Sequence, residues 1–216
     1  MNSRRFRLLL TLLFFCTGPA FAGVITYDVT VDTSSLLGTT GSIDFNFNPG
    51  SLVTQAASLQ ILDFSSDGTL AGSPALTGDV SGALPGTLTF DNATAFNDYF
   101  EGFTYGNVLS FGVSLYGPAL ASPGGATSGS AFAFSMYSDA QGTVPALTTD
   151  TTDGFAFTTD VNLDGTTTVT DFSPQTSIAA QTPTVAEPGT LELALAAALA
   201  GLFFAVLSRG ARGSSC

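Results

Sequence analysis

Apolar and polar side chains alternate along most of the middle of the chain. In residues 25–31 every second side chain is apolar, and those between are Thr or Asp. A period of two predicts a β-strand with one face in the core and the other in solvent. The same period predicts further strands at residues 43–47, 59–64, 84–90 with a break at Pro85-Gly86, 109–115, 132–136 and 155–163. Turns rich in Gly, Pro, Asn, Asp and Ser separate these segments, so we predict an all-β domain, an antiparallel β-sandwich or jelly roll.

One aromatic stretch breaks this period. Its four rings are three and four residues apart, at Phe96, Tyr99, Phe100 and Phe103. This spacing predicts one face of a helix, for which Asn92 or Thr94 is a suitable N-cap. We therefore expect one short helix across an end of the sandwich, with its rings packed on the core. The alternative for such a cluster is a platform that stacks on a sugar.

The first 22 residues have the pattern of a secretory signal peptide. Three arginines precede an apolar stretch at residues 8–16, and Ala20 and Ala22 are the small residues that signal peptidase requires. We expect an N-terminal signal helix that is cleaved after Ala22, which leaves Gly23 as the mature N-terminus. A lipoprotein signal at Cys16 is disfavoured because the three residues before it are the bulky Leu, Phe and Phe.

A second apolar segment, near the C-terminus, has almost the length of a membrane span. Residues 191–207 form a run of 17 residues, which is about 25 Å of helix against the roughly 30 Å of a hydrocarbon core. With one flanking residue at each end, we expect a C-terminal transmembrane helix over residues 190–208. Arg209 and Arg212 follow it, which predicts that the C-terminus faces the cytoplasm.

The residues on both sides of this segment have a recognisable order. Val185, Ala186, Glu187 and Pro188 precede the apolar run, and the two arginines follow it. The tail over residues 186–212 resembles the PEP-CTERM sorting signal of Gram-negative bacteria, whose motif reads Val-Pro-Glu-Pro, with Ala186 in place of the first proline. The resemblance implies an exosortase-like membrane protease as a partner and processing at Glu187 and Pro188. An ordinary C-terminal membrane anchor is the alternative.

A wider resemblance covers most of the middle region. It is carried by residues 31–36, 47–50, 78–82, 84–88 and 102–107. These segments are similar to those of an uncharacterised family of PEP-CTERM proteins of Gram-negative bacteria. The resemblance implies a small exported β-rich domain in the cell envelope or extracellular matrix, associated with exopolysaccharide and biofilm formation, and it supplies no catalytic residue.

These observations divide the chain into four parts. We expect a signal peptide at residues 1–22, a β-sandwich ectodomain at 23–172, an extended linker at 173–185 and the sorting signal at 186–212. The expected route is export across the inner membrane, a membrane-anchored precursor, and then the cell envelope or the extracellular space. Signal peptidase would act at one end and the exosortase-like protease at the other.

The ectodomain has no positively charged side chain. All five basic residues of the chain are arginines in the two targeting segments, and the chain has no histidine. Fourteen aspartates and Glu101 therefore give residues 23–185 a net charge of −15, which excludes nucleic acid and anionic membrane surfaces as electrostatic partners. Both cysteines also lie outside this region, so a disulfide, a thiolate nucleophile and a Cys or His zinc site are excluded there.

This composition leaves few kinds of catalysis. A serine nucleophile lacks a histidine base, and Schiff-base chemistry lacks a lysine. Paired carboxyl groups remain, as in glycosidases, whose two acids lie about 5 to 9.5 Å apart, but most aspartates here lie beside other turn-forming residues. We predict a non-enzymatic exported protein of the cell surface or extracellular matrix, without a cofactor. The alternative is a carbohydrate-binding module or a glycan-acting enzyme that uses surface carboxylates.

The strongest local motif begins at Asp160. Its oxygen-bearing side chains occupy positions 1, 3, 5 and 12 of a calcium loop of the EF-hand or dockerin type, at Asp160, Asn162, Asp164 and Asp171. Gly165 stands at position 6, where such loops turn sharply. The flanking residues alternate as strands, however, and Asp164-Gly165 is a hairpin-turn dipeptide. We expect a β-hairpin here, with a calcium site as the alternative.

Overall fold

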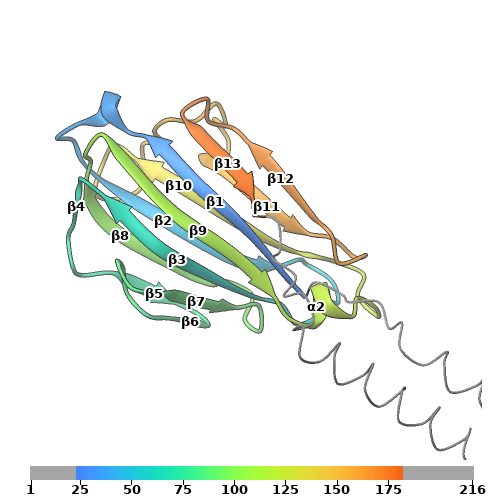
Figure 1. The fold of residues 1–216 in the computed structure, drawn as a ribbon. Coiled ribbons are helices and arrows are strands. Elements are labelled where there is room, and N and C mark those ends of the chain that lie inside the picture. Colours follow the sequence, from blue (N-terminus) through green and yellow to red (C-terminus); the bar gives the residue numbers. More distant parts are fainter. Residues whose placement is uncertain (1–22, 182–216) are drawn as a thin grey trace, which may run out of the picture. The chain divides into compact units, whose positions relative to one another are not determined.

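The computed structural model describes residues 23–181, and two antiparallel sheets account for most of them (Figure 1). In spatial order, the first sheet contains β13 (Thr176–Ala180), β1 (Val24–Asp32), β9 (Val108–Tyr116), β3 (Ser58–Ser66), β7 (Leu88–Asp91) and β6 (Val80–Ser81). The second contains β12 (Thr167–Asp171), β11 (Phe155–Val161), β10 (Ser130–Tyr137), β2 (Thr40–Pro49), β8 (Asp98–Thr104) and β4 (Thr69–Leu70), while β5 (Ala75–Thr77) also pairs with β8. The expected all-β class with antiparallel sheets is confirmed.

The core between the sheets is rich in aromatic side chains. Phe45 on β2 and Phe134 on β10 are fully buried, and their ring centroids are 4.9 Å apart. Phe111 on β9 of the first sheet meets both rings edge-on, at 5.2 Å from Phe45 and 5.0 Å from Phe134. These contacts join the inner faces of the two sheets, which is the packing of a β-sandwich.

Most strands lie where the alternation of side chains predicts them, and the exceptions are short. Of the segment expected at residues 84–90, only Leu88 onward enters a strand, because the Pro85-Gly86 break ends the ladder before it. The pattern also missed β4, β5 and β6, which contain two or three residues each. A period of two cannot be recognised over so few positions.

The helix expected at residues 96–103 is wrong. Asp98–Thr104 forms β8, in which Tyr99, Glu101 and Phe103 are buried while the residues between them are partly exposed. The rings at 99 and 103 do share one face, because they are four residues apart on a strand. Pairing with β2 favours this outcome, because Tyr and Phe fit a pleated, half-buried surface better than a helix.

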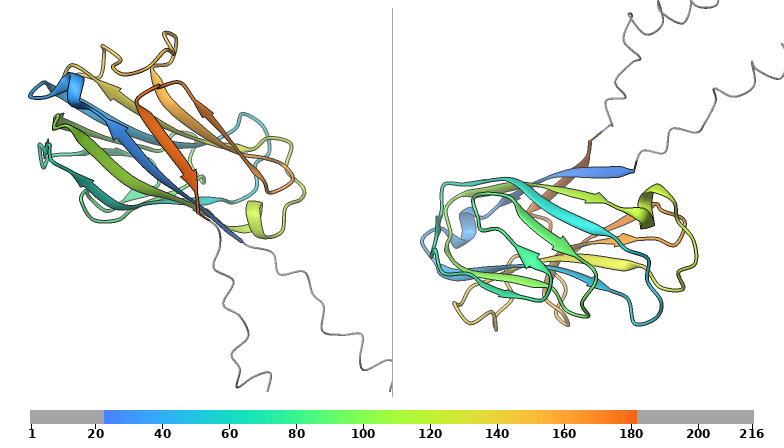
Figure 2. Two further views of the ribbon diagram at one scale, coloured as in Figure 1. Left: turned by 45° about the horizontal axis from the view of Figure 1, so that its top comes forward. Right: turned by 90° about the horizontal axis from the view of Figure 1, so that it is seen from below.

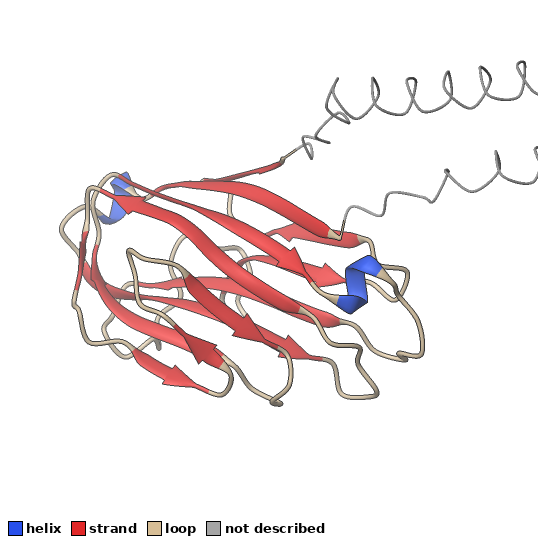
Figure 3. Ribbon diagram, turned by 60° about the horizontal axis from the view of Figure 1, so that its bottom comes forward, coloured by secondary structure: helices blue, strands red, loops and turns tan. Residues whose placement is uncertain are grey.

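Helical structure within residues 23–181 is limited to two short turns, as Figure 3 shows. They are the 3-10 turn η1 (Ser34–Leu36) and the single α-helical turn α2 (Pro118–Ala121). Gly117, with φ of 114°, precedes α2 and allows the chain to turn sharply after β9. No helix in this part of the chain is long and apolar enough to cross a membrane.

Part of the expected linker belongs to the first sheet. Residues 176–180 form β13, which pairs with residues 27–31 of β1. Ile178 packs against the core, and β13 covers a strand that would otherwise be the sheet edge. The folded domain thus continues to Gln181, beyond the boundary expected at residue 172.

Both ends of the described domain lie at one end of the sandwich. β1 and β13 are antiparallel neighbours, so the beginning of β1 lies beside the end of β13 (Figure 2). Gln181 extends this pairing, because its backbone N–H donates to the carbonyl of Thr26 at 2.8 Å. The expected signal helix and the transmembrane helix at 190–208 lie outside the described residues.

Candidate functional site

Two aspartates from neighbouring strands meet on the outer face of the second sheet. On β2, the side chains of Ile43, Phe45 and Phe47 fill the core, so Asp44 and Asn46 point to the opposite face. On β8, the same alternation turns Asp98 outward. The register places Asn46 opposite Asp98 and Asp44 two residues further along, so Asp44 and Asp98 are diagonal neighbours.

The two carboxyl groups are partly withdrawn from water and in contact. Burial raises the pKa of Asp44 to about 9, and both a hydrogen bond with Asp98 and the charge of Asp98 add to the shift. Asn46 Nδ2 donates to Asp44 Oδ1 at 2.7 Å, which lowers the pKa but does not offset the other effects. At neutral pH the Asp44 carboxyl group therefore keeps its proton.

Buried oxygen atoms with free lone pairs lie around this pair. Within residues 23–181, Asn46 Oδ1 and Ser135 Oγ are buried and accept no hydrogen bond, and Asp98 Oδ1 is buried beside Asp44. Ser135 is 1% exposed and lies on β10, directly opposite Asp44. Unpaired buried polar atoms are rare in folded proteins and call for an explanation.

Tyr137, two residues beyond Ser135 on β10, completes the group. Burial raises the pKa of its hydroxyl, a hydrogen bond from the Ser135 hydroxyl lowers it, and the charges of Asp44 and Asp98 raise it further. The phenol therefore lies close to both carboxyl groups. We call Asp44, Asn46, Asp98, Ser135 and Tyr137 the outer-face cluster.

Aromatic rings border the outer-face cluster on one side. The ring centroids of Phe100 and Tyr137 are 6.4 Å apart. Gly142, in the loop after β10, packs on Phe100 so closely that a Cβ atom there would lie 2.7 Å from the ring. The loop thus covers part of the Phe100 face, and Asp139 holds the loop in shape by accepting hydrogen bonds from the backbone N–H groups of Thr143 and Val144.

Glu101 is buried on the other face of β8 and has a structural role. Its Oε1 accepts the backbone N–H of Gly72 at 2.8 Å, and its Oε2 accepts the hydroxyl of Tyr99. The Tyr99 hydroxyl in turn accepts the backbone N–H of Leu84 at 3.2 Å. Burial and the neighbouring Glu101 raise the pKa of Tyr99, so the phenol stays protonated and the network holds two loops to the sheet.

The calcium-loop residues form the hairpin that the flanking alternation predicts. β11 and β12 pair with Asp160 opposite Thr168, while Asp171 lies opposite Phe157 at the far end of the ladder. Asp164 Oδ1 accepts the backbone N–H of Thr166 at 3.0 Å, as an ordinary turn aspartate does. The structure therefore does not bring the four predicted ligands together.

Within residues 23–181, no three Asp, Glu, His or Cys side chains are placed to hold a metal. The outer-face cluster has only two carboxylates, and its other oxygen atoms belong to amide and hydroxyl groups. The predicted processing residues Ala20, Ala22, Glu187 and Pro188 lie outside the described residues. So do Arg209 and Arg212.

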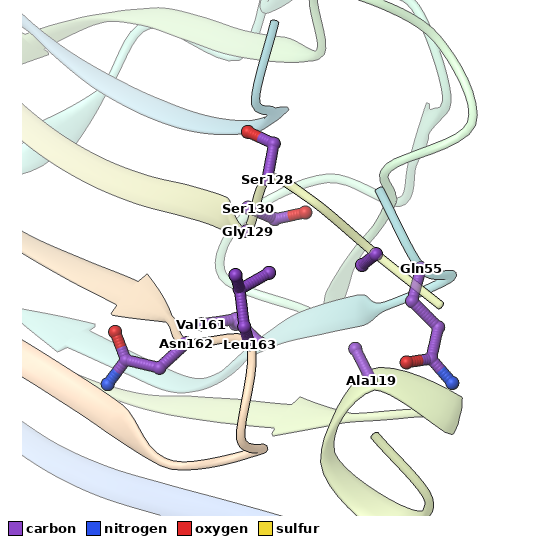
Figure 4. A pocket seen from close by; sticks show the side chains of 9 residues that line it. Gln55, Ala119, Ser128, Gly129, Ser130, Val161, Asn162 and Leu163 are labelled. Atoms are coloured by element: carbon purple, nitrogen blue, oxygen red, sulfur yellow. The ribbon is translucent and has the colours of Figure 1, made fainter. Parts of the chain in front are cut away.

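A small hollow lies at the end of the sandwich near α2, between the ends of β10 and β11. Its lining side chains include Gln55, Ala119, Ser130, Val161 and Leu163 (Figure 4). Its volume of about 10 Å³ is no larger than one water molecule needs. It is therefore a packing gap and not a ligand pocket.

Sequence reasoning missed the outer-face cluster because it placed Asp98 inside a helix. The alternation around Asp44 and Asn46 already put these two side chains on the outer face. Their partner, Asp98, can be recognised only from the pairing of β8 with β2. The alternation of Tyr99, Glu101 and Phe103 after Asp98 could have predicted a strand. It is a local pattern, however, and does not identify the strand that lies beside it.

Comparison with protein-family models gives no match, and comparisons with curated proteins and with solved structures give none either. The outer-face cluster therefore has to be interpreted from its own geometry.

Proposed function

We propose that this chain is a non-enzymatic exported protein of the cell surface or extracellular matrix. The observation that carries the proposal is the order of the tail: Glu187-Pro188, an apolar segment of nearly membrane length and two arginines. Together with the signal-peptide pattern, it supports export and membrane anchoring of a precursor. Its likeness to PEP-CTERM tails supports sorting by an exosortase-like protease, with exopolysaccharide as a partner in the matrix.

The shape of the domain is compatible with a tether at one end. The pairing of β1 with β13 brings residues 24 and 181 to the same end of the sandwich. A membrane segment attached there would leave the loops of the opposite end free to face outward. The net charge of −15 over residues 23–181 keeps such a domain hydrated and away from anionic lipid.

The geometry of the carboxyl pair gives little support to a glycosidase. Such enzymes separate their two acids by about 5 Å or more, to make room for the sugar and water. Asp44 and Asp98 instead contact each other. Glu101 is 1% exposed and bound by its own loops, which makes it a poor second acid.

Mass spectrometry of the mature protein from its own cell tests the proposal. We expect it to begin at Gly23 and to end near Glu187, with residues up to Cys216 removed. Because the chain has no Lys or Arg between residues 8 and 208, the digest needs a protease other than trypsin.

Two variants make this test specific. Glu187→Ala is expected to leave the C-terminal peptide in place, whereas Pro183→Ala, a proline outside the motif, leaves processing unchanged. A wild-type protein that keeps its residues up to Cys216 would contradict sorting and support an ordinary membrane anchor.

Carbohydrate binding is the second candidate, and the aromatic pair Phe100 and Tyr137 beside acidic groups favours it. A pull-down with the host's exopolysaccharide tests it. Tyr137→Ala should then lose most of the binding, and Tyr116→Ala on the first sheet should lose none. Equal retention of both variants, or no retention of the wild type, would contradict carbohydrate binding at this site. The domain would then be a passive component of the matrix.

A further inference from the structure

The outer-face cluster lacks the partner that buried carboxyl groups usually have. In most proteins a Lys, Arg or His side chain neutralises such a pair. Residues 23–181 contain none of these side chains. No side chain of residues 23–181 therefore supplies a positive charge to Asp44 and Asp98, and a proton or a cation from solution can supply it instead.

The five side chains of the cluster can surround a single ion. They come from three adjacent strands: Asp98 from β8, Asp44 and Asn46 from the central β2, and Ser135 and Tyr137 from β10. Neighbouring strands are about 4.8 Å apart, and directly opposite Cβ atoms about 5 Å apart. An ion above β2 is thus within reach of side chains from both flanking strands.

The oxygen atoms of the cluster are the right ones for such an ion. Within residues 23–181, Asn46 Oδ1 and Ser135 Oγ accept no hydrogen bond, and Ser135 is almost completely buried at the base of the cluster. Asp98 Oδ1 is buried beside Asp44. Oxygen atoms with free lone pairs on the same face as the carboxyl pair can coordinate a cation.

We propose that the outer-face cluster binds one calcium ion, with Asp44, Asp98, Asn46 and Ser135 as protein ligands. Every donor is a carboxylate, amide or hydroxyl oxygen, the set that hard divalent cations prefer, and calcium accepts six to eight oxygens in flexible arrangements. Two carboxylates balance the double charge. Asp44, Asn46 and Asp98 are partly exposed, so solvent can deliver the ion and supply the remaining ligands as water.

This site is distinct from the motif at residues 160–171. The motif shares no residue with the cluster, and its side chains follow the β11–β12 hairpin. Its turn carboxylate, at Asp164, is already satisfied by Thr166. If calcium uptake is measured, substitutions in the cluster and in the motif can therefore show which of the two binds the ion.

Calorimetry on the full chain, purified in detergent and freed of metal with EGTA, tests the proposal. We expect one calcium per chain with a Kd on the order of 10⁻⁴ M, as in extracellular calcium modules. Asp98→Asn should weaken binding at least ten-fold. Asp153→Asn, the same change at an exposed aspartate on a loop, and Asp164→Asn should each change the Kd less than two-fold.

Terbium luminescence provides an independent measure of position. The chain has no tryptophan, so a bound terbium ion can be excited only through a nearby tyrosine. Tyr137→Phe should remove most of the emission even where calorimetry still detects bound ion. The urea midpoint of Asp98→Asn in EGTA, which should not fall below that of the wild type, shows that lost binding is not unfolding.

Three outcomes would overturn the site. They are no saturable heat up to 10 mM calcium, which is on the order of a hundred times the expected Kd, an equal loss of affinity in Asp98→Asn and Asp153→Asn, or emission that does not depend on Tyr137. The second would indicate diffuse attraction of calcium to an acidic surface. The first would leave a proton as the only positive charge between Asp44 and Asp98.

Discussion

The aspartates of this domain fall into two groups with opposite surroundings. Asp44 and Asp98 lie on the face of a sheet, in contact, and burial raises the pKa of Asp44. Asp67 and Asp164 are exposed in turns, where hydrogen bonds from Asn107 and Thr166 side chains, together with backbone N–H groups, lower their pKa.

The difference shows what determines the cost of a charge in a domain without basic residues. In a turn, nearby N–H groups point at the carboxylate and replace a cation as its partner. On the outer face of a central strand, the backbone N–H groups are already used in the ladder, so only side chains and solvent remain. The surroundings in a turn stabilise the ionised form of the carboxyl group, whereas the surroundings on the sheet favour the protonated form of Asp44.

The pH dependence of stability should show this contrast most strongly. In EGTA, the unfolded chain loses the proton of Asp44 near its ordinary pKa of 3.8, whereas the folded chain keeps it up to about 9. The unfolded state thus binds fewer protons in this window, so the stability conferred by this group falls as pH rises and is lost by about pH 9. The slope is at most about 1.4 kcal/mol per pH unit.

The turn aspartates have the opposite sign. Their lowered pKa gives stability that is present above the ordinary value and lost as pH falls through the folded value. Urea unfolding from pH 3 to 10 should therefore have its maximum near the lower end of the range, at about pH 4 to 5. A curve that rises steadily from pH 5 to 9 would contradict the assignment of the pair.

Removing one charge of the pair should stabilise the metal-free domain. Asp44→Asn keeps an acceptor for Asn46 and gives Asp98 an amide donor, so we expect about 2 kcal/mol of added stability at pH 7.5. It should also flatten the pH profile between 5 and 9. Chemical unfolding in EGTA measures both effects, and an unchanged or reduced free energy of unfolding would count against the contact between the carboxyl groups.

The same type of substitution in a turn should destabilise the domain. Asp67 accepts the backbone N–H groups of Asn107 and Val108 at 2.7 and 3.0 Å and thereby joins the turns after β3 and β8. Asp67→Ala should lower Tm by roughly 3 to 6 °C, because these N–H groups lose a charged acceptor. Asp153→Ala is the control, and both Tm values are measured by differential scanning calorimetry. Equal Tm values would show that an aspartate bound by backbone N–H groups contributes no more stability than an exposed one.

The smallest effect is expected at the base of the cluster. Ser135→Ala removes a buried hydroxyl whose oxygen accepts no hydrogen bond within residues 23–181, so in EGTA we expect a change within about 0.5 kcal/mol. With 5 mM calcium present, the variant should gain less stability than the wild type. A large loss in EGTA would mean that the hydroxyl is important for the fold even without calcium.

The sequence alone determined most of the longer strands, the electrostatics and the likeness of the tail to a sorting signal. Alternation in residues 25–31 and 43–47 is a local property, because each side chain's face follows from its position in the strand. The absence of basic residues between 23 and 181 follows from composition. The same local patterns identified the hairpin at Asp164-Gly165 and the turn role of its aspartate.

Only the tertiary structure decided which strands are neighbours. The aromatic spacing at 96–103 fits a helix and a strand almost equally well, and pairing with β2 selected the strand. Pairing with β1 likewise drew residues 176–180 into the first sheet. Because strand pairing depends on surfaces that are distant in sequence, the contact of Asp44 with Asp98 and the position of Ser135 beside them became visible only in the folded sheet.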